Sequence, residues 1–120
     1  MNAIQIISVM ERFEFKCALT ESKDYHIEHW LPQVRGGETS VENCYPLDAT
    51  LNLRKGKQNP FEFFEREDIR QHYDVERFNR LVFWLAFNND MTVVEFRSFT
   101  LWAYENENPN ISDWKRGNFE

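Results

Sequence analysis

The strongest constraint on how this chain folds is a run of apolar residues at helical spacing in residues 77–88. Its apolar positions follow the i, i+3, i+4, i+7, i+8 pattern of a helix that buries one face: Phe78, Leu81, Val82, Leu85 and Ala86. Asn89 and Asp90 interrupt this pattern. Residues 92–95 then have the spacing of a capping box, in which the Thr92 and Glu95 side chains each bond the other's backbone. We therefore expect one helix over 77–88 and a last helix that runs to about Tyr104.

Aromatic residues supply most of the expected core. The 120-residue chain holds 11 Phe, 4 Trp and 4 Tyr, which is enough for one domain, 1–120, to bury a core without disulfides. The clusters Phe61–Phe64 and Phe83–Trp84 could stack on nucleic-acid bases if they were exposed. Because residues 58–120 hold 12 acidic and 7 basic side chains, we expect both clusters to pack in the core instead. Residues 61–105 should then form a helical buttress.

Shorter elements are expected in the first half. Apolar residues at about three-residue steps predict a short amphipathic helix whose inward stripe is Ile4, Ile7, Met10 and Phe13. Strands are expected at 15–19, at 25–31, where Pro32 stops the ladder, and at 43–47, with a loop over 33–42. Asp48 is the expected N-cap of a helix that ends near Gly56. The end, 106–120, is expected to be a loose tail from which two apolar residues dock, Ile111 and Trp114.

Net charge and cysteine content exclude several classes of protein. A formal net charge of −6 argues against a uniformly basic surface that wraps nucleic acid, so any such contact needs a local basic patch. Cys17 and Cys44, the only cysteines, are too few for a disulfide scaffold and lack Cys-x-x-Cys spacing, so we expect reduced core thiols. No apolar run is long enough to span a membrane, and the N-terminus does not resemble a signal peptide. We expect a cytoplasmic protein with no membrane partner.

One stretch carries the residue types of metal-assisted phosphodiester cleavage. It comprises Glu28-His29-Trp30-Leu31-Pro32, Gly36-Gly37, Glu42-Asn43 and Asn52-Leu53-Arg54-Lys55-Gly56-Lys57. A carboxylate and an amide oxygen suit a hard cation such as Mg²⁺ and leave coordination positions for water and phosphate. Histidine, whose ordinary pKa is about 6.5, can take a proton from water at neutral pH. The basic residues beside the amide could hold neighbouring phosphates.

These residues resemble the HNH endonuclease motif of the ββα-metal, or His-Me finger, nucleases, in which two strands and a helix surround one divalent cation. The family pattern is an acidic residue or histidine followed by His-x-x-Pro, a Gly-Gly loop, a middle Asn, and a last Asn or His on the helix. The separations also agree, with 14 residues from His29 to Asn43 and 24 from Glu28 to Asn52. The resemblance covers 15–60 and identifies an HNN variant. It implies an α+β fold, with a ββα-metal (HNH) core, an N-terminal helix and a C-terminal helical extension.

The resemblance also implies a role for each matching residue. His29 corresponds to the general base, and Asn43 to the residue that holds the loop and the orientation of the histidine. Glu28 and Asn52 correspond to the metal ligands. The family's phosphate-contacting residues are matched by Arg54, Lys55 and Lys57. The implied protein is a DNA endonuclease with a single divalent cation, Mg²⁺ or Mn²⁺, and without the structural zinc that cysteine pairs hold in many relatives.

Other interpretations of these residues stay open. Taken singly, each is an ordinary solvated or turn residue, and the alternative function is a catalytically inactive HNH-derived module that binds nucleic acid or protein. The same site could cleave RNA, and a homodimer or a partner protein could supply specificity. Neighbours on a strand face opposite ways, so Glu28 and His29 can share a site only if the strand ends there, as Pro32 predicts. By the same alternation we expect His26 to be structural or at the substrate rim, and His72 to be a surface residue.

Overall fold

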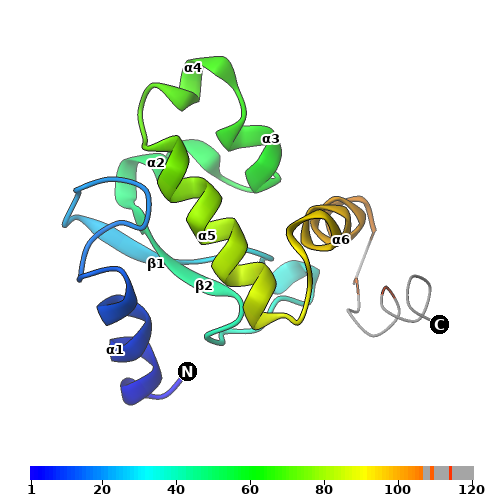
Figure 1. Ribbon diagram of the computed structural model, residues 1–120, viewed down its shortest axis with the longest axis horizontal. Coiled ribbons are helices and arrows are strands. Elements are labelled where there is room, and N and C mark those ends of the chain that lie inside the picture. Colours follow the sequence, from blue (N-terminus) through cyan, green and yellow to red (C-terminus); the bar gives the residue numbers. More distant parts are fainter. Residues whose placement is uncertain (107–108, 110–113, 115–120) are drawn as a thin grey trace.

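The computed structural model describes residues 1–106, 109 and 114, and it has an α+β architecture (Figure 1). A helix precedes a two-stranded antiparallel hairpin, and most of the described chain after the hairpin is helical. The elements are, in order, α1 (Ala3–Arg12), β1 (Tyr25–His29), a 3₁₀ turn (Gln33–Arg35), β2 (Cys44–Asp48), α2 (Ala49–Lys55), α3 (Pro60–Phe64), α4 (Glu67–Arg70), α5 (Val75–Asn88) and α6 (Val93–Glu105). The α+β class is confirmed. Among the described residues, no helix has the length and apolar character that crossing a membrane requires.

The N-terminal helix forms where the sequence predicts it, but it buries a different face. A capping box starts α1, with the Asn2 side chain bonded to the Gln5 amide at 2.8 Å. Ile4 and Ile7 are 79% and 47% exposed, whereas Val9 is buried. The predicted inward stripe is therefore wrong in its first half. A three-residue step turns progressively around a helix of about 3.6 residues per turn, so only the later positions reach the rest of the protein.

The segment 15–19, predicted to be a strand, is a loop. Glu14 and Phe15 both adopt left-handed backbone angles, φ 59° and 56°, which turn the chain after α1. The Cys17 amide bonds the Ser22 carbonyl at 2.8 Å and folds the segment back on itself. The Ala18 amide bonds the Pro46 carbonyl of β2 at 2.9 Å, and the Cys17 sulfur accepts from the Asp48 amide at 3.2 Å. The apolar composition of the segment thus reflects burial beside the sheet edge and not pairing within the sheet.

The hairpin places the predicted motif at its closed end. β1 and β2 pair from Tyr25↔Asp48 to His29↔Cys44, so that Glu28 lies opposite Tyr45. The strands are close to the predicted ranges 25–31 and 43–47, although β1 is shorter. One further bond, from the Trp30 amide to the Asn43 carbonyl at 2.8 Å, follows the ladder. β1 therefore ends directly after the Glu28–His29 pair.

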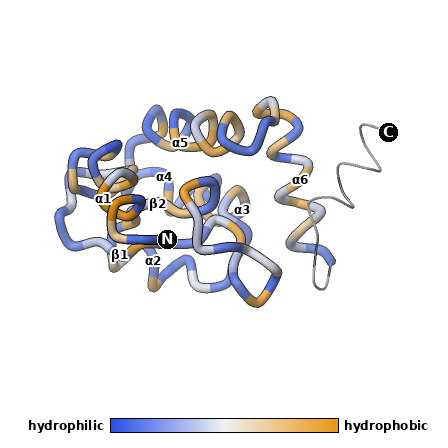
Figure 2. Tube along the Cα trace, turned by 90° about the horizontal axis from the view of Figure 1, so that it is seen from below, coloured by the Kyte–Doolittle hydropathy of each residue, from blue (hydrophilic) through white to orange (hydrophobic). Residues whose placement is uncertain are grey.

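Helices cover both sides of the hairpin. In Figure 2 α5 lies on one side of β1 and β2, and α2 lies on the other. The predicted α5 face is confirmed, since Phe78, Leu81, Val82, Leu85 and Ala86 are all buried. The capping box of α6 is also confirmed, with the Glu95 amide 3.1 Å from the Thr92 hydroxyl and the Thr92 amide 2.9 Å from the Glu95 carboxylate.

The aromatic clusters divide between core and surface. Phe61, Phe63 and Phe64 are buried, as predicted. Phe83 is 63% exposed, so its predicted core position is wrong. Its neighbour Trp84 is half-buried and meets the Phe13 ring edge-on at 5.2 Å. The core face of α5 is already filled by its aliphatic residues and Phe78, which leaves Phe83 on the opposite side of the helix.

The core joins the hairpin to the C-terminal helices through Trp30. Its ring is 1% exposed and lies 5.2 Å from Phe61 and 5.3 Å from Phe96. The indole N–H donates to the Thr100 hydroxyl at 3.0 Å, and the Trp30 carbonyl accepts from the Tyr104 hydroxyl at 2.9 Å. The polar groups of this buried tryptophan thus have partners on α6 and on the hairpin.

One residue of the predicted tail docks as expected. Trp114 is buried, and its ring meets Phe99 edge-on at 5.5 Å, so the predicted docking of this residue is confirmed. Ile111, the other residue predicted to dock, lies outside the described residues.

Replacing Thr100 with valine tests the link between Trp30 and α6. Thr100→Val removes the acceptor of the buried indole N–H at nearly constant volume, so the free energy of unfolding in urea should fall by about 1–3 kcal/mol. Thr100→Ser keeps the hydroxyl and should lose less. The exposed Ser98→Ala on the same helix serves as a control, and equal stability of Thr100→Val and Ser98→Ala would contradict the assignment.

Candidate active site

Two adjacent elements bring the predicted metal ligands to one surface. The Asp48 carboxylate accepts from the Leu51 amide at 3.0 Å and starts α2 directly after β2. The helix ends at Gly56, as predicted, where a left-handed φ of 54° turns the chain. Because α2 begins at the residue after β2, the helix folds back along the hairpin and presents Asn52 toward β1.

An open groove of about 560 Å³ lies between β1 and α2. Glu28 and His26, two residues apart on β1, line it from the strand, and Asn52 lines it from the helix. The remaining lining residues are Ala49, Thr50, Leu53 and Gly56. Glu28 and Asn52, which are 24 positions apart in the chain, thus line the same groove. His26, for which the sequence predicts a structural or substrate-rim role, is one of the lining residues.

Glu28 forms an ion pair with a buried lysine. The Lys55 ammonium lies 3.2 Å from Glu28 Oε2 and also donates to the Gly56 carbonyl at 3.2 Å. The Lys55 side chain is 1% exposed and that of Glu28 is 17% exposed. Glu28 Oε1 accepts from the His29 amide at 2.8 Å. Lys55, which sequence reasoning groups with the phosphate-contacting residues, is therefore buried and holds the carboxylate that lines the groove.

A buried phenol lies next to this pair. Tyr45 faces Glu28 across the hairpin, and its hydroxyl is buried without a hydrogen-bond partner among the described residues. Burial and, after it, the charge of Glu28 raise the pKa of Tyr45 well above its ordinary value. The hydroxyl therefore stays protonated and remains a potential donor beside the Glu28 carboxylate.

His29 is held by a residue that the motif does not include. Its Nε2 lies 2.8 Å from the Thr39 hydroxyl, which also accepts from the Gln33 side-chain amide at 3.0 Å. In the described part of the chain, Nδ1 has no hydrogen-bond partner. His29 follows the groove residue Glu28 in the chain, but its ring does not line the groove. No spacing or residue type marks Thr39, because its role depends on how the loop after Gly37 folds.

Asn43 clamps the two ends of that loop. Its side chain accepts from the Leu31 amide at 2.9 Å and donates to the carbonyls of Leu31 at 2.9 Å and Glu38 at 2.8 Å. Gly37 passes so close to this segment that a Cβ would overlap the Leu31 carbonyl. These contacts fix the course of residues 31–38 and hence the position of Thr39 beside His29.

The other two basic residues of the motif stand apart from the groove lining. Arg54 and Lys57 are exposed and are available to a ligand that extends beyond the groove. Both cysteines are free and buried, and burial raises the pKa of Cys44. Neither thiol is therefore an expected metal ligand or nucleophile.

The groove offers a divalent cation a small set of oxygen donors. In the described part of the chain, no three His, Cys, Asp or Glu side chains gather in a way that could hold a metal ion. The groove instead provides one carboxylate and one amide oxygen, which is an all-oxygen pair of the kind that Mg²⁺ accepts together with water and phosphate. Each carboxylate oxygen has more than one lone pair, so Glu28 can keep its present contacts and still bind a cation. The oxygen donors of Glu28 and Asn52 therefore fit a divalent cation.

Comparisons with known proteins add no identification: no protein-family model, no curated protein and no solved structure matches the chain.

A double-mutant cycle tests the buried ion pair. Glu28→Ala should lower the free energy of unfolding by about 2–4 kcal/mol, because it leaves the Lys55 ammonium buried without its carboxylate. Adding Lys55→Met should restore part of this loss. Urea denaturation measures both effects. Strictly additive losses would show that the two side chains are not coupled.

The clamp formed by Asn43 gives a local prediction. Asn43→Ala removes three hydrogen bonds, so the free energy of unfolding should fall by about 1–3 kcal/mol and the Leu31 amide should exchange faster with deuterium. Asn79→Ala, at an exposed position on α5, is the control. Unchanged Leu31 exchange in Asn43→Ala would contradict the clamp.

Proposed function

We propose that this protein is an HNH-type, metal-dependent endonuclease that hydrolyses phosphodiester bonds in DNA. The main support is that Glu28 and Asn52, the two ligands implied by the motif, line one groove between β1 and α2. The order of two antiparallel strands followed directly by a helix is consistent with a ββα-metal core. Glu28 and Asn52 are far apart in the sequence, so it is the fold, and not the motif alone, that brings both to one groove.

The proposed general base is His29. Nε2 lies beside the Thr39 hydroxyl, and in the tautomer in which Nε2 donates to that hydroxyl, Nδ1 is the nitrogen that can take a proton from an attacking water. Asn43 acts indirectly, because it holds the loop that carries Thr39. His29 is the last residue of β1 and does not line the groove, so as a base it would act from the groove's edge.

Glu28 and Asn52 would hold the divalent cation. When bound, a cation at this position supplies charge stabilisation for the scissile phosphate and its leaving oxygen. Lys55 orients the Glu28 carboxylate and lowers the free-energy cost of partly burying that carboxylate. Arg54 and Lys57, both exposed on either side of Gly56, would contact the neighbouring phosphates.

The proposed substrate is DNA, with RNA as a substrate that the same residues could also cleave. The net charge of −6 implies weak general attraction to a polyanion, so a homodimer or a partner protein would supply specificity. The two free thiols are consistent with a reducing compartment, and we propose the cytoplasm.

One observation favours the alternative of an inactive binding module. Lys55 already neutralises Glu28, so the groove has little net negative charge with which to attract a cation. If the protein only binds nucleic acid or protein, the groove would keep its shape without cleavage. A cleavage assay separates these two functions.

The test is nicking of supercoiled plasmid DNA with Mg²⁺, with Mn²⁺ and with EDTA. We expect cleavage with a metal ion and none with EDTA. His29→Ala and Asn52→Ala should each reduce the rate by about 100-fold or more, since each removes a separate part of the catalytic machinery. Glu28→Ala is a poor choice here because it also breaks the buried ion pair.

Matched controls are His72→Ala and Asn79→Ala, which remove the same residue types at exposed positions elsewhere in the fold. Both should cleave like the wild type. Absence of cleavage with either metal, or undiminished cleavage by folded His29→Ala protein, would replace the nuclease proposal with the binding module.

A further inference from the structure

A second concave site lies away from the groove and is lined by basic side chains. This hollow, of about 200 Å³, lies between the end of α1, the loop that follows it, and α5. Four cations from these three segments line it: Arg12, Lys16, Arg77 and Arg80. Among the described residues, Glu14 is the only acidic one in its lining, and it lies 3.5 Å from the Lys16 ammonium. In a chain whose net charge is −6, this is a local concentration of positive charge.

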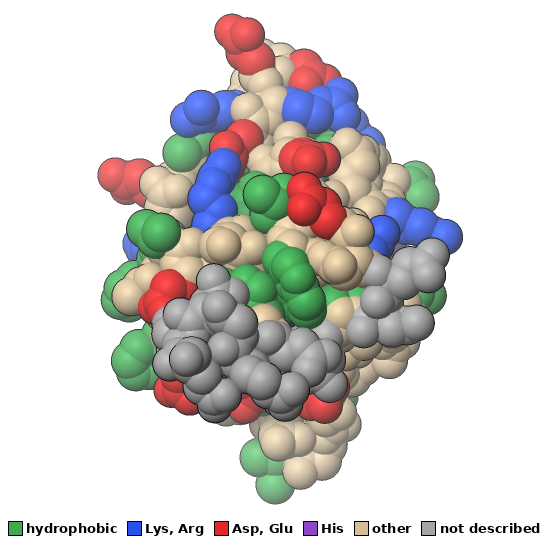
Figure 3. Space-filling view, turned by 90° about the vertical axis from the view of Figure 1, so that its right-hand side faces the viewer, with side chains coloured by type: hydrophobic (Ala, Val, Ile, Leu, Met, Phe, Trp, Pro, Cys, Tyr) green, Lys and Arg blue, Asp and Glu red, His purple; other side chains and the backbone are tan. Residues whose placement is uncertain are grey.

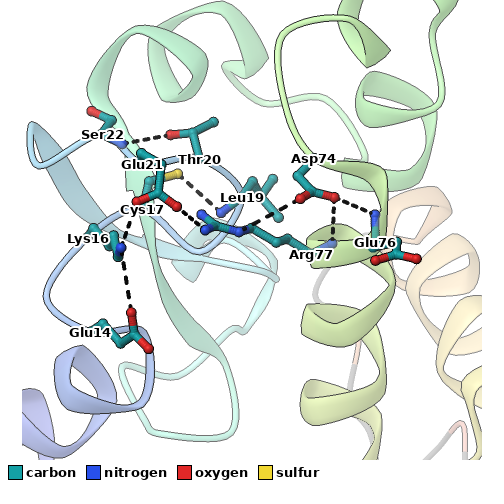
Figure 4. Close-up of polar contacts among 10 residues, drawn as sticks. All are labelled: Glu14, Lys16, Cys17, Leu19, Thr20, Glu21, Ser22, Asp74, Glu76 and Arg77. Carbon is teal, nitrogen blue, oxygen red and sulfur yellow. Dashed lines mark hydrogen bonds and ion pairs between the residues drawn. The ribbon is translucent and has the colours of Figure 1, made fainter.

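The four cations differ in how many carboxylates lie near them. Glu21 bridges Lys16, at 2.6 Å, and Arg77, and Asp74 lies 4.0 Å from the Arg77 guanidinium (Figure 4). Arg12 lies over the rings of Phe13 and Trp84, at 5.7 and 6.0 Å, and has no carboxylate partner among the described residues. Arg80 likewise has no ion pair in the described part of the chain.

The basic hollow continues into an exposed aromatic stripe on α5. Arg80, Phe83 and Phe87 are spaced by three and four residues, so they lie on one face of the helix. Phe83 and Phe87 are 63% and 70% exposed. Two phenylalanines in water beside an uncompensated guanidinium are not explained by core packing, and exposed apolar surface of this kind usually marks a binding site.

We propose that the hollow and this stripe, together the α5 face, bind single-stranded nucleic acid. The cations, above all Arg12 and Arg80, would hold backbone phosphates, and the rings of Phe83 and Phe87 would stack on successive bases. Seven residues separate Arg80 from Phe87, which is about 10 Å along a helix and matches a short run of nucleotides. Proteins that bind single strands commonly combine cations that contact phosphates with aromatic rings on which any base can stack.

The charge pattern disfavours a second copy of this chain on the α5 face. In a symmetric pair the same patch meets itself, so the cations of both copies would be brought into one interface without any added negative charge. A polyanion meets no such opposition. In the view of Figure 3, taken from the right-hand side of Figure 1, acidic and basic side chains lie interspersed in the upper part of the surface.

The proposed single-strand site is separate from the groove. α5 lies across the hairpin from α2 (Figure 2), and the two sets of lining residues share no member among the described residues. The inference therefore goes beyond the proposed nuclease function and does not depend on it. In a nuclease, such a site would retain a displaced or flanking single strand while the groove engages the bond to be cut.

The test is binding of a fluorescein-labelled oligothymidylate, followed by fluorescence anisotropy in EDTA so that no cleavage occurs. Wild-type protein should bind it more tightly than a duplex of equal length. Phe83→Ala with Phe87→Ala should weaken binding at least about tenfold. Arg12→Ala with Arg80→Ala should weaken it and reduce the slope of log Kd against log salt by roughly one unit.

Three controls localise the effect. Val94→Ala removes an exposed apolar side chain from α6, and Lys23→Ala removes an exposed cation from a loop; both should bind like the wild type. Thr50→Ala alters the groove lining at a residue outside the proposed catalytic set and should also bind normally, whatever the result of the plasmid assay. No binding by the wild type, equal affinity for duplex, or unchanged binding in both double variants would overturn the proposal and favour a protein partner for the α5 face.

Discussion

The burial of Trp30 is the contact on which the rest of the structure depends. It follows the Glu28–His29 pair directly, and its ring packs against aromatic residues of α3 and α6. Its indole N–H and its carbonyl both bond to α6. Since the residue next to His29 cannot move without disturbing this core, the end of β1 has a fixed position. The open face of the hairpin is then free to carry polar residues without losing its shape.

The groove is built on a charge pair that the motif does not reveal. A carboxylate that lines a groove and a buried lysine are each costly to desolvate, and together they satisfy each other. Tyr45 adds a protonated hydroxyl on the same side of the hairpin. The Glu28 side chain reaches both the buried lysine and the groove. Glu28 therefore contributes both to the stability of the site and to its proposed chemistry.

The sequence predicts the elements with strong periodic or capping signals, namely α2, α5, α6 and the hairpin. It fails at 15–19, where apolar residues are buried by tertiary contacts that have no regular period, and on the buried face of α1, where Ile4 and Ile7 are exposed. For the site, spacing predicts which residues belong to the motif, and the placement of Glu28 and Asn52 in one groove lining agrees with it. Thr39 and the burial of Lys55 depend on loop and helix packing, so no local pattern could indicate them. Phe83 shows the converse error, because composition alone cannot distinguish a core face from an exposed one.

The bonds that hold Trp30 have a consequence for the order in which the protein folds. They join residues 70 and 74 positions apart, whereas the paired residues of the hairpin are only 15 to 23 positions apart. Closing such long loops costs chain entropy, and contacts of this kind form late. During synthesis the hairpin therefore emerges well before the helix that fixes its end. A nascent chain that stops short of α6 has the motif residues but lacks the tertiary support that orders them, so full site order comes only with the completed fold.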